Sequence, residues 1–136
     1  MMNMVISTIE HGPTTVVGIT GEIDLETATK LRTVLEQLVA ADRVDLVLDL
    51  AGLEFVDSTG LGILVGCLKA VRQRDGWIRI AAVNERILRL LTITGLERIL
   101  PVHDTVEQAL AAGPVPPSEA TAALAGGSTR LNNRTP

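Results

Sequence analysis

The sequence predicts a single α/β domain with a mixed β-sheet of four to five strands and about four helices. Two observations carry this prediction: short runs rich in Val, Ile and Thr alternate with segments of helical period, and the first two runs follow each other directly across a turn. Strands that alternate with helices build a parallel sheet, whereas an opening hairpin adds an antiparallel pair. The expected order is strand, strand, helix, strand, helix, strand, helix, an optional strand, and a last helix.

The N-terminal part of the chain is expected to form the hairpin, a helix and a buried strand. Residues 4–9 and 14–20 are the two β-prone runs, and His11-Gly12-Pro13 between them is a turn signal. In residues 25–41 the apolar side chains recur three and four positions apart, which predicts an amphipathic helix. Residues 44–50, Val-Asp-Leu-Val-Leu-Asp-Leu, are typical of a strand in the centre of a sheet.

The long helix predicted for residues 58–74 is apolar over much of its circumference. Its apolar side chains form two stripes, one of Leu61, Leu64, Leu68 and Val71 and the other of Ile63, Cys67 and Ala70. A helix with two apolar sides either packs against more than one surface or keeps one face for a partner.

Two further strands and a shorter helix follow. Residues 77–83 are predicted to form a strand, and Asn84 is expected to cap a helix over residues 85–92. Residues 99–102 are a candidate for a last strand at the edge of the sheet, because a proline within them cannot donate a hydrogen bond to a neighbouring strand.

The domain is predicted to span residues 1–112 and to close with a helix that Asp104 caps and that reaches about Ala111. From residue 113 to residue 136 the composition shifts to Pro, Ala, Gly, Ser and Thr. Such a segment buries too little apolar surface to offset the entropy lost on ordering. We therefore predict a flexible or disordered C-terminal tail over residues 113–136.

Composition and charge exclude several classes of partner. The net charge is −4, which gives no electrostatic attraction for nucleic acid or anionic lipid. Phe55 and Trp77 are the only aromatic side chains, too few to stack bases. No window reaches the ~18 apolar residues of a membrane span, and the N-terminus lacks the pattern of a signal peptide. We expect a cytoplasmic protein that binds neither nucleic acid nor membrane.

The residues also favour a binding protein over an enzyme. Cys67, the single cysteine, lies in an apolar run and is expected to be a small buried side chain. His11 and His103 are the only histidines, and both are expected at the surface. No Cys/His spacing suits zinc, and no Walker-type glycine-rich loop is present. We predict no catalytic residue, no cofactor and no metal site.

The main functional signal is the string Val56-Asp57-Ser58-Thr59-Gly60-Leu61-Gly62, which joins the buried strand of residues 44–50 to the long helix. Ends of strands in α/β sheets are where ligands and partners usually meet the fold. Ser58 occupies the position of an N-cap, with its hydroxyl near unpaired backbone N–H groups. The two glycines would let another backbone or a phosphate approach closely.

Two interpretations of Ser58 stay open on the residues alone. In the first, Asp57, Ser58 and Thr59 only compete to cap a helix. In the second, the helix N-terminus presents Ser58 for phosphorylation, which adds about −1.5 to −2 charges. A partner docked over Asp57 and the acidic loop Glu22-Ile23-Asp24 would then be repelled, so the switch would act on binding rather than on folding. Asp24 equally fits an N-cap of the helix that follows it.

Two segments together resemble the bacterial anti-sigma factor antagonists, which consist of a STAS domain. One is Gly21-Glu22-Ile23-Asp24, and the other is the string from Val56 to Gly62. The similarity runs from about Met4 to Leu110 and is greatest with the BldG-like members of actinobacteria.

The resemblance implies a partner-switching cycle. The unphosphorylated antagonist binds an anti-sigma factor, often a serine kinase, which then frees its sigma factor. The kinase phosphorylates the serine matching Ser58, with Thr59 as the second candidate, and a PP2C-type phosphatase restores the unmodified form. The residues that the resemblance assigns to partner binding are Glu22, Asp24, Asp57, Ser58, Thr59, Gly60 and Gly62. The kinase supplies nucleotide and metal, so the antagonist needs no cofactor.

Two alternative functions are considered, and the first of them keeps the same fold. A STAS domain also serves as a scaffold or regulatory subunit without a link to a sigma factor. A hydrolase with Ser58 as nucleophile is the third hypothesis, and it requires a histidine close to Ser58 in space.

Overall fold

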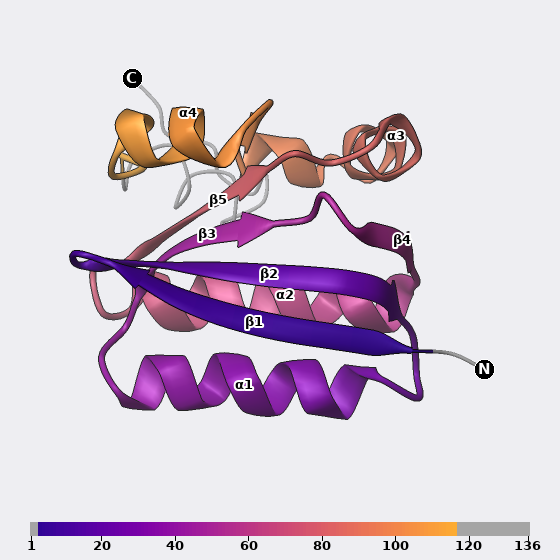
Figure 1. Ribbon diagram of the computed structural model, residues 1–136, viewed down its shortest axis with the longest axis horizontal. Helices are drawn as coiled ribbons and strands as arrows, with labels where there is room; N and C mark the ends of the chain where they lie inside the picture. The colour runs from indigo at the N-terminus through magenta and orange to yellow at the C-terminus, as the bar shows by residue number, and fades with distance from the viewer. Residues whose placement is uncertain (1–2, 117–136) are drawn as a thin grey trace, which may run out of the picture.

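The computed structural model describes residues 3–116, which form a six-stranded sheet flanked by helices (Figure 1). The elements in chain order are β1 (Met4–His11), β2 (Thr14–Ile23), α1 (Ala28–Ala40), β3 (Asp45–Asp49), β4 (Leu53–Val56), α2 (Ser58–Arg72), β5 (Trp77–Ala81), α3 (Glu85–Ile93), the 3-10 helix η1 (Leu96–Arg98), β6 (Val102–His103) and α4 (Val106–Ala112). The predicted α/β class with a mixed sheet is confirmed.

The sheet has the strand order β1-β2-β3-β5-β6, and β4 pairs with β2 beside this path. Among the strands of residues 3–116, only the β1–β2 hairpin is antiparallel, as the sequence predicts. The first half of β2 pairs with β3, and its last three residues, Gly21 to Ile23, pair with β4. β4 was not predicted, because its four residues follow the turn at Gly52 and show no alternation of buried and exposed side chains.

Helices cover both faces of the sheet. Figure 1 shows α1 and α2 side by side along one face and α4 on the opposite face. The larger apolar core lies between the sheet and the α1–α2 pair, and residues from α3 extend it at one end. The smaller core joins Trp77 and Val47 of the sheet to Ala109 of α4.

The helix termini correct three details of the sequence predictions. α1 begins at Ala28, three residues later than expected, because the preceding residues form turns. α2 ends at Arg72. The final helix is capped by Thr105, whose Oγ1 accepts a hydrogen bond from the backbone N–H of Gln108 at 3.0 Å, and not by Asp104. The expected cap of α3 is confirmed, since Asn84 Oδ1 accepts from the backbone N–H of Ile87 at 2.8 Å.

The edge strand expected at residues 99–102 is displaced toward the C-terminus. Leu96–Arg98 forms a 3-10 helix, and the chain pairs with β5 only at Val102 and His103. No helix within residues 3–116 is both long enough and apolar enough to cross a bilayer.

The residues that follow α4 lie against the sheet. Arg79 of β5 donates hydrogen bonds to the carbonyl oxygens of Gly113 and Pro114, and Arg72 donates to that of Val115. Val115 is buried in the smaller core. The domain boundary at residue 112 and the tail over residues 113–136 remain predictions, and residues 117–136 of that tail lie outside the described part of the chain.

Candidate functional site

The fold brings the two sequence motifs together at one end of the sheet. β2 and β4 run parallel, with Ile23 paired to Val56. The backbone N–H of Asp57 continues this pairing by donating to the carbonyl oxygen of Ile23 at 3.0 Å. The acidic loop after β2 and the N-terminus of α2 after β4 are therefore neighbours, although more than thirty residues separate them in the sequence.

Asp57, and not Ser58, caps helix α2. Asp57 has extended backbone angles, and its Oδ1 accepts a hydrogen bond from the backbone N–H of Gly60 at 3.0 Å. Its carbonyl oxygen accepts from Leu61, which closes the first helical turn. Ser58 was expected at the N-cap position but is the first residue of the helix.

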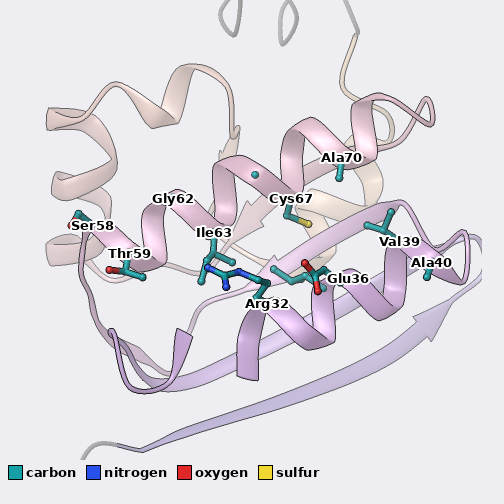
Figure 2. A pocket seen from close by; sticks show the side chains of 12 residues that line it. Arg32, Glu36, Val39, Ala40, Ser58, Thr59, Gly62, Ile63, Cys67 and Ala70 are labelled. Atoms are coloured by element: carbon teal, nitrogen blue, oxygen red, sulfur yellow. The ribbon is translucent and has the colours of Figure 1, made fainter. Parts of the chain in front are cut away.

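This arrangement leaves the Ser58 side chain at the surface. Ser58 is exposed, and within residues 3–116 no hydrogen bond is recorded for its hydroxyl group. Thr59, the second candidate for phosphorylation, is half-buried. Both lie at one end of a groove between α1 and α2, where Figure 2 shows them on the first turn of α2.

Asp24 stabilises its own loop. Only 9% of its surface is exposed, and its Oδ1 accepts hydrogen bonds from the backbone N–H groups of Glu26 and Thr27 at 2.9 and 3.0 Å. The alternative N-cap role is not observed, because Thr27 holds the cap position of α1 and makes no side-chain capping bond. The Asp24 carboxylate thus holds the turn between β2 and α1.

Thr27 makes a second set of hydrogen bonds in this loop, a role for its side chain that was not predicted. Its hydroxyl donates to the carbonyl oxygen of Glu22 at 2.8 Å and accepts from the backbone N–H of Asp24 at 3.0 Å. A threonine three residues after an Asp in a strand-to-helix connection is the signal that would have identified this hydrogen-bonded turn.

The two glycines of the motif have different surroundings. Gly60 is buried, and a Cβ atom there would lie 2.6 Å from Ile23 Cγ2 and 2.7 Å from Val56 Cγ2. Gly62 is exposed, and an added Cβ would meet no atom within 4 Å. Gly60 therefore lets α2 pack closely on the two paired strands, whereas Gly62 keeps the outer surface of α2 open.

Glu22 lies on a different part of this end of the domain. It lines a second hollow of about 420 Å³ together with Phe55, which is 44% exposed, and Glu54, Asn84 and Arg86. Phe55 and Glu54 belong to the unpredicted strand β4, so their position could not be expected from the sequence.

The two histidines lie away from Ser58. His11 ends β1 at the hairpin, at the opposite end of β2 from Ile23. His103 contacts Arg79, which projects from the sheet face that α4 covers, and burial and this cation lower the pKa of its ring. The geometry needed for a Ser–His nucleophile is therefore absent at Ser58 within the described residues.

Comparison with known proteins assigns this fold to a family. A model of the STAS domain family matches residues 5–109, so the chain belongs to the STAS domain family. The family expected from the two motifs is thereby confirmed.

Two relatives and one solved structure that are at least 30% identical to this chain are named as anti-sigma factor antagonists. An anti-sigma-B factor antagonist from Staphylococcus epidermidis is 41% identical over 106 residues, which cover 78% of this chain and 98% of the relative. An anti-sigma F factor antagonist from Paenibacillus polymyxa is 33% identical over 110 residues, which cover 80% and 94%. A crystal structure of an anti-sigma factor antagonist from Mycobacterium paratuberculosis superposes with a TM-score of 0.75 at 31% identity and covers 81% of this chain and 93% of that one.

Proposed function

We propose that this protein is an anti-sigma factor antagonist that phosphorylation of Ser58 switches off. The unphosphorylated form binds an anti-sigma factor with serine kinase activity, which then releases its sigma factor. Phosphorylation by that kinase ends the interaction, and a PP2C-type phosphatase restores it. The observation that carries this proposal is the exposed hydroxyl of Ser58 on a helix that Asp57 already caps.

The position of Ser58 explains why a phosphate would spare the fold. The first turn of a helix carries the positive end of the helix dipole and unpaired backbone N–H groups. Within residues 3–116 the hydroxyl makes no hydrogen bond that a phosphate would break. The added charge of about −1.5 to −2 is therefore accommodated by the domain itself.

The surroundings explain why the same phosphate would act on a partner. Asp57 precedes Ser58 in the chain, and the turn that holds Asp24 lies next to Asp57, so phosphorylation adds negative charge close to two carboxylates. A partner that buries this surface would have to desolvate the phosphate and would lose any contact with the serine hydroxyl. Phosphorylation would therefore make the free energy of binding less favourable and leave the free energy of unfolding nearly unchanged.

The first test is intact-mass spectrometry with site mapping on protein isolated from its native cell. We expect a single phosphate on Ser58 that a PP2C-type phosphatase removes. Protein that stays unmodified under growth and stress, and in lysate supplied with ATP, would contradict the switch and favour a constitutive scaffold.

The second test measures binding to the anti-sigma factor kinase of the same organism by calorimetry. Wild type and Ser58→Ala should bind with similar affinity, whereas Ser58→Asp should bind at least tenfold more weakly. Ser58→Ala should also resist inactivation by kinase and ATP. Equal binding by all three forms would refute the proposal.

A further inference from the structure

The groove between α1 and α2 extends well beyond Ser58. It has a volume of about 580 Å³ and runs from Ser58 and Thr59 at one end toward Ala40 and Ala70 at the other (Figure 2). The stretch of α2 from Thr59 to Ala70 is about 16 Å long at 1.5 Å per residue, which is three helical turns.

The floor of the groove is apolar. Leu35 of α1 and Ile63 and Cys67 of α2 are buried at its base, and Val39 lines it farther along. Burial raises the pKa of the Cys67 thiol to about 11, so this side chain is uncharged at neutral pH. The three buried side chains are at most 9% exposed, so the floor of the groove is apolar and continuous with the core of the domain.

The wall formed by α2 lacks side chains at two positions one turn apart. Gly62 and Gly66 are both exposed, and an added Cβ would meet no atom within 4 Å at either residue. Glycine inside a helix lowers helix stability, and unlike Gly60 these two glycines relieve no contact within the described domain. Their effect is to let another backbone approach α2 closely.

The rim formed by α1 carries one charge of each sign. Arg32 and Glu36 are exposed and one helical turn apart, and both line the groove. Within residues 3–116 neither side chain is recorded in a hydrogen bond or an ion pair, whereas Arg74 pairs with Asp42. Figure 2 shows Arg32 nearer than Glu36 to the Ser58 end.

We propose that this groove binds an amphipathic α-helix of the anti-sigma factor, an inference that rests on the proposed function. The apolar face of that helix lies on Ile63 and Cys67, and its backbone passes close to Gly62 and Gly66. An acidic side chain of the partner faces Arg32, and a basic side chain one turn away faces Glu36. The apolar floor, the two glycines and the charge of each sign on the rim suit an amphipathic helix, whose backbone can approach α2 closely and whose polar edge can carry both charges.

Docking in this groove links the partner to the phosphorylation site. Ser58 stands at the end of the groove where Arg32 lies, so a phosphate there adds negative charge near the acidic side chain of the docked helix. The same phosphate competes with that side chain for the Arg32 guanidinium. One covalent change at the mouth of the groove therefore weakens a contact three turns long.

The proposal is tested by photo-crosslinking with the anti-sigma factor kinase of the same organism. One variant has Ala40, at the far end of the groove, replaced by p-benzoylphenylalanine. The other has Leu25 replaced, a 78% exposed residue beside the Asp24 loop and outside the groove. We expect both variants to crosslink, and we expect the Ala40 product to map to a partner helix with acidic and basic residues one turn apart.

The crosslinking outcomes separate the two proposals. A crosslink from position 25 without one from position 40 would overturn the groove inference and leave the proposed function standing. A crosslink from position 40 to a second copy of this chain, or to a non-helical segment of the kinase, would also overturn it. If neither variant forms a complex with the kinase, the proposed function is refuted, and the groove inference is refuted with it.

A substitution in the groove gives an independent measurement. Gly66→Leu should lower the affinity for the kinase at least tenfold, because it fills the groove, and should not lower the Tm, because leucine is a better helix former than glycine. The matched control is Ala111→Leu on the exposed side of α4, which should bind within twofold of wild type. Gly66→Leu protein that binds within twofold of wild type would contradict the proposal.

Charge reversal on the rim provides the last check. Arg32→Glu should weaken kinase binding at least fivefold, whereas Arg89→Glu, exposed on α3 outside the groove, should leave it within twofold. Equal effects of the two reversals would mean that only the overall charge of the domain matters.

Discussion

The Asp57 carboxylate accepts a hydrogen bond from the backbone N–H of Gly60 at 3.0 Å, across the two hydroxyl residues that lie between them. The three consecutive residues whose side chains could cap a helix thus have different surroundings and different roles. Asp57 caps, Ser58 is exposed, and Thr59 is half-buried at the groove. Because the cap is provided by its neighbour, Ser58 can change its charge without loss of the helix N-terminus.

The first prediction separates the capping role of Asp57 from its charge. Asp57→Ala should lower the free energy of unfolding by about 1 kcal/mol, because an orphan N–H group of α2 loses its acceptor. Asp57→Asn keeps an acceptor oxygen and should stay within about 0.5 kcal/mol of wild type. Urea unfolding followed by circular dichroism measures both, and equal destabilisation by the two variants would contradict the capping role.

The second prediction compares the two glycines of the motif. Gly60→Ala should destabilise the domain by about 1–3 kcal/mol, because its Cβ would lie within 2.7 Å of Ile23 Cγ2 and Val56 Cγ2. Gly62→Ala meets nothing within 4 Å and should stabilise the helix by about 0.5–1 kcal/mol. Thermal unfolding of the pair should give shifts of opposite sign, and shifts of the same sign would show that the close packing at Gly60 is not limiting.

The third prediction concerns the loop after β2. Asp24→Ala removes the acceptor of the Glu26 and Thr27 N–H groups and should cost about 1–3 kcal/mol of stability. Asp24→Asn retains a side-chain oxygen and should keep most of the stability and, within threefold, the affinity for the anti-sigma factor kinase. Loss of binding by a fully stable Asp24→Asn protein would assign the carboxylate to direct contact with the partner.

The fourth prediction follows from the raised pKa of Cys67, which is about 11 against an ordinary value of 9.0. At pH 8 the folded thiol therefore stays protonated, and a thiol reagent should label native protein far more slowly than protein in urea. The folded pKa is the higher one, and the unfolded state therefore loses its proton first as the pH rises.

Because of this difference in the pKa of the thiol, the free energy of unfolding should decrease as the pH increases from about 9 toward 11. Cys67→Ala should lack that part of the pH dependence, whatever its own stability at neutral pH. Unfolding free energies of both proteins at several pH values provide the measurement. Parallel curves, or equal labelling rates for native and unfolded wild type, would contradict the burial of this thiol.

Much of the fold follows from local patterns. The hairpin is marked by two β-prone runs around a turn, and α1 by apolar residues three and four apart, so local period and turn chemistry suffice to predict both. β4 escapes such patterns, because Glu54 and Phe55 are both exposed and the strand exists only through its pairing with the end of β2. The late start of α1 depends on the hydrogen bonds of Asp24, which no propensity scale includes.

The site was only partly predictable, because it too depends on contacts that local sequence patterns do not include. The two motifs could be recognised, and the second apolar stripe of α2 supplies Ile63 and Cys67 to the core, in agreement with the expectation that α2 packs against more than one surface. Three adjacent residues with capping side chains do not reveal which of them caps, since that depends on the extended backbone at Asp57. The groove is a tertiary feature, formed only when Arg32 and Glu36 of α1 come to lie beside α2.

The division of β2 between two parallel partners has a consequence for local opening. Separating β4 from β2 breaks the pairing of only Gly21, Glu22 and Ile23, while the five paired positions between β2 and β3 stay intact. Amide hydrogens of Leu53 to Val56 should therefore exchange with solvent deuterium faster than those of Leu46 to Leu48. Faster exchange at these residues would mean that the strand leading to Ser58 opens while the rest of the sheet remains folded, whereas equal rates would mean that β4 opens only together with the whole sheet.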